Sequence, residues 1–341
     1  MRKVLCFGEL LLRVSPSQNE NWLKANAVHV YVGGAEFNVA AALSKWGVPV
    51  SYCTVVPDNY FSKKIADELQ QKNIDTSLIH FSGKRIGIYF LAQGSDLKHA
   101  GVIYDREHSS FAELKPGVLE WDKILNDVSW FHFSAISPAL NENIAAVCKE
   151  GLEAASKKNI RISVDLNHRA KLWQYGKKPV DIMPELVQYC DVVMGNIWSA
   201  NALLGIDVDE AIHQKGKKTD YLEHAKKTSV HIQQQFPKCK TVANTFRFDH
   251  CQEVILYYAS LFNDGCQYNS VEFIAHEIVD KVGTGDCFMA GLIYGLYHKN
   301  NLQDTVDFAA AAAFGKLFEN GDFTENDAIA IRSILELKKQ P

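Results

Sequence analysis

The sequence predicts an α/β fold built on an open, mainly parallel sheet, and three stretches of the chain support that prediction. An apolar run over residues 3–8 ends in Gly-Glu, as expected of a buried strand that runs into the ligand-binding edge of such a sheet. A strand candidate over 50–56 precedes an amphipathic helix candidate over 61–71. The same order returns with strand candidates at 130–133 and 160–164 on either side of a helix at 143–157. This alternation is typical of βαβ units.

Length, charge and cysteine usage narrow the class of protein. The 341 residues suit one large domain with an appendage. The net charge is −4 and Lys and Arg are dispersed, so we expect small-molecule partners rather than nucleic acid or a membrane surface. The eight cysteines form no Cys-x-x-Cys pair, which indicates reduced thiols in a cytoplasmic protein. No apolar run approaches the ~18 residues of a membrane span.

Two pairs of strand candidates interrupt the βαβ order because no helix separates their members. The first pair lies at 10–14 and 28–32, and the second at 85–91 and 102–106. We therefore expect two hairpins, over about 10–32 and about 85–106, that together form a small β lid across one face of the larger domain.

The stretch over residues 280–297 contains the candidate catalytic centre. Gly283, Thr284 and Gly285 precede a helix pattern with apolar residues spaced over 288–296. A helix start presents unpaired N–H groups and a positive dipole end, so this loop can wrap an anion. Asp286 at the same place suits a general base that takes a proton from an attacking hydroxyl. The combination suits phosphoryl transfer, although an N-cap aspartate in an ordinary tight turn is an equal alternative from these residues alone.

A second glycine pair precedes another helix candidate. Gly33 and Gly34 remove side chains where a ligand or the backbone comes close, and Asn38 falls in the first turn of the helix. Taken alone, this pattern favours a simple junction between a loop and a helix.

Polar residues follow the strand candidate at 160–164. Asp165, Asn167 and Arg169 alternate at its carboxyl end, the edge where open α/β sheets bind ligands. Capping of the next helix by Asp165 and Asn167 is an equal alternative.

The lid strands carry candidate groups for recognition of a carboxylate. Arg106 follows the last lid strand, and Tyr89 and Tyr104 lie on the same pair of strands. An arginine in a forked contact, together with tyrosine hydroxyls, suits an acidic substrate. From these residues alone, a surface ion pair of Arg106 with Asp105 or Glu107 is the favoured interpretation.

Two of these motifs resemble the signatures of the PfkB (ribokinase-like) carbohydrate kinases. They are Gly-Gly-x-x-x-Asn-x-Ala over 33–40 and Asp-x-x-Gly-x-Gly-Asp over 280–286. The Asp-x-Asn-x-Arg run over 165–169 resembles the corresponding segment of 2-keto-3-deoxygluconate kinases. The resemblance implies a single ribokinase-like domain over 1–341, a three-layer α/β/α sandwich with a mainly parallel sheet and a β lid. It also implies a homodimer formed through the lid.

The resemblance assigns roles to single residues. It implies Asp286 as the general base and Gly283, Thr284 and Gly285 as the anion hole. The sugar is implied to contact Gly33, Gly34, Asn38, Tyr89 and Tyr104, and its carboxylate to contact Arg106 and Arg169. The nucleotide is implied to contact Asp165, Asn167, Asn196 and Arg247 together with Gly283 and Gly285.

The implied reaction is phosphorylation of 2-keto-3-deoxygluconate by ATP to give its 6-phosphate. Mg²⁺ would bridge the phosphates, and the family analogy adds a monovalent cation such as K⁺ near Asp280, where Lys281 replaces the usual Thr. Two other functions stay open: a kinase for a neutral sugar, of the fructokinase or ribokinase type, and a non-catalytic sugar-binding or regulatory protein on a kinase fold.

Two departures from the family pattern support that last alternative. Ser199 stands where the family has the Glu of Asn-x-x-Glu, and residues 242–247 lack the usual Thr-x-Gly turn. Phe246 and Arg247 are bulky for such a turn, and Arg247 could contact a phosphate instead.

Overall fold

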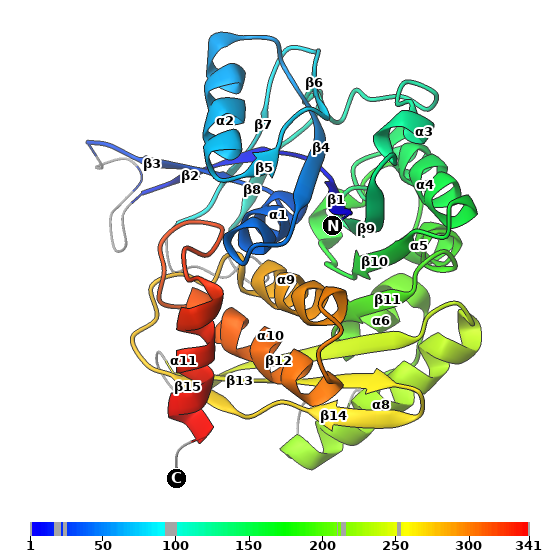
Figure 1. Cartoon of the computed structure of the whole chain (residues 1–341), viewed down its shortest axis with the longest axis vertical. Helices are drawn as coiled ribbons and strands as arrows, with labels where there is room; N and C mark the ends of the chain where they lie inside the picture. The colour runs from blue at the N-terminus through cyan, green and yellow to red at the C-terminus, as the bar shows by residue number, and fades with distance from the viewer. Residues whose placement is uncertain are drawn as a thin grey trace.

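A central sheet of eleven strands organises the chain in the computed structural model (Figure 1). The structure describes residues 2–16, 22, 26–92, 101–209, 211–212, 216–250 and 254–339, except for the side chains of 249 and 250. The strands of this sheet are β1 (Lys3–Phe7), β4 (Val50–Val56), β5 (Ile74–Asp75), β6 (Ile79–Phe81), β9 (Val128–Ser134), β10 (Arg161–Asp165), β11 (Val192–Gly195), β12 (Thr241–His250), β13 (Val254–Asn263), β14 (Cys266–Asn269) and β15 (Phe273–Ala275).

The sheet is mainly parallel, as predicted. Its order is β14-β13-β12-β11-β10-β9-β1-β4-β5, with β6 on β4 and β15 on β13. Every described pair from β12 across to β5 is parallel, and β13 is antiparallel to β12, β14 and β15. The carboxyl ends of β1, β9, β10 and β11 therefore meet at one edge.

Helices cover both faces of the sheet, which makes three layers (Figure 1). On β1, Val4 and Cys6 enter one apolar cluster and Leu5 and Phe7 enter the other, because alternate side chains of a strand point to opposite faces. The first cluster includes residues of α1 (Ala35–Lys45), α2 (Tyr60–Gln71), α9 (Thr284–Tyr297), α10 (Leu302–Lys316) and α11 (Ala328–Lys339). The second includes residues of α3 (Trp121–Ile124), α4 (Glu142–Lys157), α5 (Pro179–Val187), α6 (Ile197–Leu204) and α8 (Lys218–Gln235).

The two predicted hairpins join into one four-stranded sheet that projects from the body (Figure 1). Its order is β3-β2-β7-β8, with β2 (Leu11–Ser15) antiparallel to β3 (His29–Gly33) and β7 (Gly87–Phe90) antiparallel to β8 (Ile103–Asp105). A parallel pairing of β2 with β7 connects the hairpins. Residues 17–21, 23–25 and 93–100 of the two lid segments lie outside the described chain.

The predicted fold class is confirmed, but residues 242–247 form no turn. They lie in β12, which pairs with β13 over ten positions. Phe246 is fully buried beside Tyr221 and Tyr258, so its bulk fills an apolar cluster. The departure from the family pattern at Phe246 is thus explained by packing under β12 and β13.

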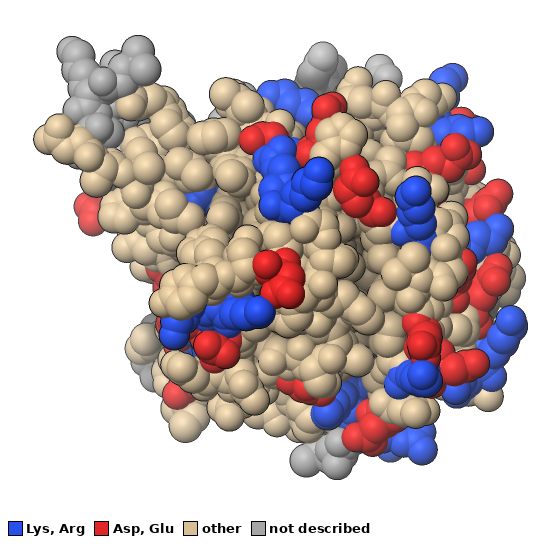
Figure 2. Space-filling model, turned by 90° about the horizontal axis from the view of Figure 1, so that it is seen from above, with Lys and Arg blue, Asp and Glu red and all other residues tan. Residues whose placement is uncertain are grey.

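Charged side chains of both signs mix on the face shown in Figure 2, and the projecting part of the lid carries few of them there. Within the described residues, no helix combines the length and the apolar character that a membrane crossing needs.

Candidate active site

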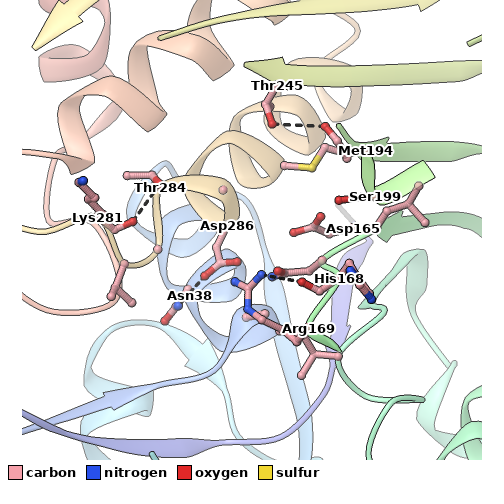
Figure 3. A pocket seen from close by; sticks show the side chains of 18 of the residues that line it. Asn38, Asp165, His168, Arg169, Met194, Ser199, Thr245, Lys281, Thr284 and Asp286 are labelled. Atoms are coloured by element: carbon pink, nitrogen blue, oxygen red, sulfur yellow. Dashed lines mark hydrogen bonds between the residues drawn. The ribbon is translucent and has the colours of Figure 1, made fainter. Parts of the chain in front are cut away.

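A cavity lies where the carboxyl ends of β10 and β11, the start of α9 and the lid come together (Figure 3). All the predicted site residues except Gly33 line it: Gly34, Asn38, Tyr89, Tyr104, Arg106, Asp165, Asn167, Arg169, Asn196, Arg247, Gly283, Thr284, Gly285 and Asp286. The residues predicted from the carboxyl end of a strand and those predicted from the two glycine motifs therefore line the same cavity.

The start of α9 has the geometry of an anion site. Gly283 is the N-cap with φ 77°, a conformation that favours glycine, and its backbone packs so closely on Asp322 that a Cβ would lie 1.8 Å from that residue's carbonyl oxygen. Gly285 faces open space. The first N–H groups of a helix have no intrahelical acceptor, so this end of α9 can receive an anion from the cavity.

Asp286 is buried in the first turn of α9 and acts as no cap. Its Oδ2 accepts a hydrogen bond of 2.7 Å from Asn38 Nδ2, and the N-cap position belongs to Gly283. The alternative of a capping aspartate is therefore wrong. Burial raises the pKa of Asp286 to about 7, although the bond from Asn38 and the charge of Arg169 act in the opposite direction. A carboxyl group with such a pKa can exchange a proton near neutral pH.

Arg247 adds positive charge beside the anion site. Its Nη1 lies 3.4 Å from Thr284 Oγ1, and both residues line the cavity. Lys281 also lines the cavity, and its carbonyl accepts from Thr284 Oγ1 at 3.0 Å. An anion at the start of α9 would therefore meet backbone donors and neighbouring cationic side chains.

The Asp-x-Asn-x-Arg run borders the cavity on the opposite side. The segment after β10 is a 3-10 helix, Ala170–Leu172, whose N-cap is Arg169, and it has no side-chain cap. The alternative that Asp165 and Asn167 cap the next helix is therefore wrong. Arg169 Nη1 donates to the carbonyl of His168 at 3.0 Å, and Figure 3 shows its guanidinium directed toward Asp286.

Arg106 is buried at the cavity wall and binds a partner that the sequence did not suggest. Its Nε and Nη2 contact Glu9 Oε2 at 2.7 Å and 2.5 Å. The prediction of a surface ion pair between Arg106 and Asp105 or Glu107 is wrong, because Arg106 is buried against Glu9 and Asp105 pairs with Arg85 instead. Glu9 follows Gly8 directly after β1, at the ligand-binding edge of the sheet. This position is the sequence feature that could have marked Glu9 as a residue near the site.

Gly33 and Asn196 have other neighbours than expected. Gly33 lies outside the cavity lining, and its missing Cβ leaves space for the carboxylate of Asp322. Asn196 is the N-cap of α6, where its Oδ1 accepts from the N–H of Ser199. Ser199 also lines the cavity, so a hydroxyl stands where the family has an acidic group.

Several lining residues were not predicted: Leu11, Ile136, His168, Met194, Trp198, Tyr257 and Asp322. His168, Met194 and Trp198 lie within two positions of a predicted site residue, which is the signal that could have found them, whereas Leu11, Ile136 and Tyr257 have no such neighbour. Asp322 has no such signal, because it comes from the segment between α10 and α11.

Comparison with known proteins identifies the family. Residues 1–236 and 255–322 match the pfkB family carbohydrate kinase profile. The chain belongs to the pfkB family of carbohydrate kinases. This kinase is 26% identical over 320 residues to a 2-dehydro-3-deoxygalactonokinase of Haloferax volcanii, with 94% of this chain and 92% of the relative covered.

Solved structures agree with this assignment. The kinase resembles the 2-dehydro-3-deoxygluconokinase of Thermotoga maritima with a TM-score of 0.89 at 33% identity, covering 98% of this chain and 100% of the other. It resembles a PfkB family carbohydrate kinase of Listeria grayi with a TM-score of 0.85 at 30% identity, covering 99% and 100%. The predicted family, fold class and enzyme class are thus confirmed.

Replacing Asp286 with Asn should change how the stability of this kinase depends on pH. Burial raises the pKa of Asp286 above its ordinary 3.8 to about 7, so between these pH values the carboxyl is ionised in the unfolded chain but protonated in the folded protein, and the wild type loses stability as the pH rises. The three-unit difference corresponds to about 4 kcal/mol. The urea midpoint of Asp286→Asn relative to wild type should therefore rise between about pH 4 and about pH 7 and stay level above that. Asp58→Asn, at an exposed ion pair with Lys63, serves as control, and a flat difference for both variants would contradict the assignment.

Proposed function

We propose that this kinase transfers the γ-phosphoryl group of ATP to a small acidic sugar, with 2-keto-3-deoxygluconate as substrate and its 6-phosphate as product. The observation that carries the proposal is that Arg106 and Arg169 line the same cavity as Asp286. The name of the 33% identical Thermotoga enzyme, a 2-dehydro-3-deoxygluconokinase, supports the same substrate.

Asp286 takes the proton of the attacking hydroxyl in this proposal. Asn38 holds one carboxylate oxygen through its Nδ2, which leaves the other oxygen of Asp286 to face the substrate. Because the pKa of Asp286 is about 7, the carboxylate form is available at neutral pH and is a stronger base than an exposed aspartate.

The phosphates of ATP occupy the start of α9. The N–H groups of Gly283, Thr284 and Gly285 receive the transferred group, and Arg247 contacts it from β12. Mg²⁺ fits this site as a companion of the phosphates, because Asp165 is a cavity carboxylate and Mg²⁺ commonly binds one or two carboxylates plus phosphate oxygens. Within the described chain, no group of three His, Cys, Asp or Glu side chains could hold a metal ion by itself. When bound, the ion would neutralise charge on the phosphates.

The sugar lies under the lid, between Asp286 and the two arginines. Arg169 is the principal ligand of its carboxylate, since Nε and Nη2 of Arg106 are engaged by Glu9. Arg106 then presents Nη1 to the substrate. A neutral sugar would use the same base and anion site but would leave the charge of Arg169 without a substrate partner.

We also propose that two copies pair through the outer face of the lid. The strand register aligns Val30, Val14, Phe90 and Ile103 across its four strands, on the face opposite Arg13. Val30 and Ile103 are 53% and 62% exposed. An exposed apolar row of this kind is typical of an interface, so Ile103→Lys should shift the kinase to a smaller species in light scattering. A wild-type monomer would contradict the proposal.

Asp286→Asn should abolish turnover and leave sugar binding close to normal, because the change removes the base and keeps the shape and the contact with Asn38.

For wild type, kcat/KM should rise with pH and level off above an apparent pKa near 7, since this profile reports the base of the free enzyme. Phosphate transfer is measured by ADP release and sugar binding by calorimetry. A variant with nearly the wild-type rate would rule out the role.

Arg169→Lys should raise KM for 2-keto-3-deoxygluconate about ten- to a hundred-fold, because lysine keeps the charge but loses the forked contact with a carboxylate. KM for a neutral sugar should hardly change. Arg85→Lys, at the exposed pair with Asp105, is the matched control. Equal losses on acidic and neutral sugars would mean that Arg169 acts on ATP or on the fold, and the acidic-sugar assignment would fall.

A further inference from the structure

Charged side chains from three distant parts of the sequence form a buried charge cluster behind the anion site, made of Arg13, Asp280, Lys316 and Asp322. Arg13 lies on lid strand β2 and is fully buried. Its Nη2 lies 2.6 Å from Asp280 Oδ2 and donates to it. Its Nε lies 2.8 Å from Asp322 Oδ1 as an ion pair without hydrogen-bond geometry. The guanidinium therefore bridges two carboxylates that border the loop before α9.

The lid surrounds Arg13 with aromatic side chains. In the strand register, Tyr31 and Tyr89 are its neighbours on β3 and β7. The guanidinium lies 4.5 Å from the ring centre of Tyr31, and the hydroxyl of Tyr89 donates to Asp322 Oδ2 at 2.5 Å. Burial alone would lower the pKa of Arg13, but Asp322, Tyr89 and Asp280 raise it above its ordinary value. Arg13 is therefore a permanent cation in this place.

Lys316 supplies a second cation at the end of α10. It is also fully buried, and its Nζ donates to the carbonyl of Glu319 at 3.1 Å. A Cβ on Gly283 would lie 3.5 Å from Lys316 Cε, so the lysine packs directly behind the anion-site loop. Burial lowers the pKa of Lys316 below its ordinary value, and the charges of Asp280 and Glu319 offset part of that effect.

The monovalent cation that the family resemblance implied near Asp280 does not fit these residues. Asp280 has no exposed surface, its Oδ2 is held by Arg13, and its Oδ1 accepts the N–H of Val282 at 3.1 Å. The nearby carbonyl of Glu319 holds the ammonium of Lys316. Hard cations bind through several oxygen atoms, whereas both oxygens of Asp280 and the carbonyl of Glu319 already have donors, and two fixed cations would repel a third.

We propose that Arg13 and Lys316 are resident cations that position the anion-site loop, and that the kinase therefore works without a monovalent metal ion. The proposal rests on the assignment of residues 283–285 as the phosphate site. Both are positioning residues, because they act on the loop and touch no reacting atom. Arg13 acts through Asp280 and Asp322, and Lys316 through its packing against Gly283.

The first test compares salts at equal ionic strength. ADP release by the wild type should show the same kcat and the same KM for ATP with tetramethylammonium, Li⁺, Na⁺ or K⁺ as the sole monovalent cation. Its melting temperature should likewise not respond specifically to K⁺, since the residues around Asp280 leave no site where the folded protein would bind the ion. The melting test needs no catalysis, so it decides the proposal even if the assigned sugar is not a substrate.

The second test removes the ammonium. Lys316→Met keeps most of the side-chain volume, and it should weaken KM for ATP or kcat by about ten- to a hundred-fold, as expected for loss of a buried charged donor. Lys316→Ala opens space behind Gly283, so K⁺ or NH₄⁺ should restore part of its activity and raise its melting temperature, whereas tetramethylammonium should not. Lys45→Met, at an exposed pair with Glu325, is the control.

Three results would overturn the proposal. The first is a wild-type rate that rises several-fold with K⁺ over tetramethylammonium, and the second is a K⁺-specific rise of the wild-type melting temperature. The third is a folded Lys316→Met variant with unchanged kcat and unchanged KM for ATP. Loss of activity on every sugar, with no K⁺ effect on melting, would instead reject the assigned substrate and leave the resident cations in place.

Discussion

The burial of Asp286 is the constraint around which the site is arranged. A carboxylate in the first turn of an apolar helix loses its hydration, and the protein compensates with a hydrogen bond from Asn38 and the charge of Arg169. Asn38 comes from α1, Arg169 from the segment after β10 and Asp286 from α9, so Asp286 keeps its geometry only when these three parts of the chain are assembled. The same burial gives the group a pKa useful for proton transfer, so the stability that burial costs is linked to the proposed chemistry.

Much of the fold and of the site could be predicted because the signals are local. A strand and its following helix show different periodicities, and parallel strands bring their carboxyl ends to one edge whatever the rest of the chain does. This is why Asp165, Asn167 and Arg169 could be named as candidates for the ligand-binding edge, although capping by Asp165 and Asn167 stayed an equal alternative until the structure was known. Gly283 could be singled out from the sequence because a glycine before a helix indicates backbone that a side chain would disturb, and its positive φ and close contact with Asp322 fit that interpretation.

Charge partners could not be predicted, because a buried ion pair and a solvated one look alike in a sequence. Arg106 lies beside two acidic residues in the chain, yet it contacts Glu9, 97 positions away. Arg13 lies on an alternating strand whose inward face was unknown, and its partner Asp280 is 267 positions away. The packing of Phe246 could not be predicted either. Its position in the sequence suggested an altered nucleotide turn, but the pairing of β12 with β13 places it in an apolar cluster.

The lid and the start of α9, the proposed phosphate site, are joined by shared contacts. Tyr89 belongs to the lid and donates to Asp322, while the backbone of Asp322 packs against Gly283 at the start of α9. Arg13 joins the same lid sheet to Asp280, in the loop that leads to that helix. These contacts tie the support of the loop before α9 to the position of the lid. Because the linking groups are buried and charged, separating them would leave charges unpaired, and this cost favours the arrangement in which lid and loop are both in place.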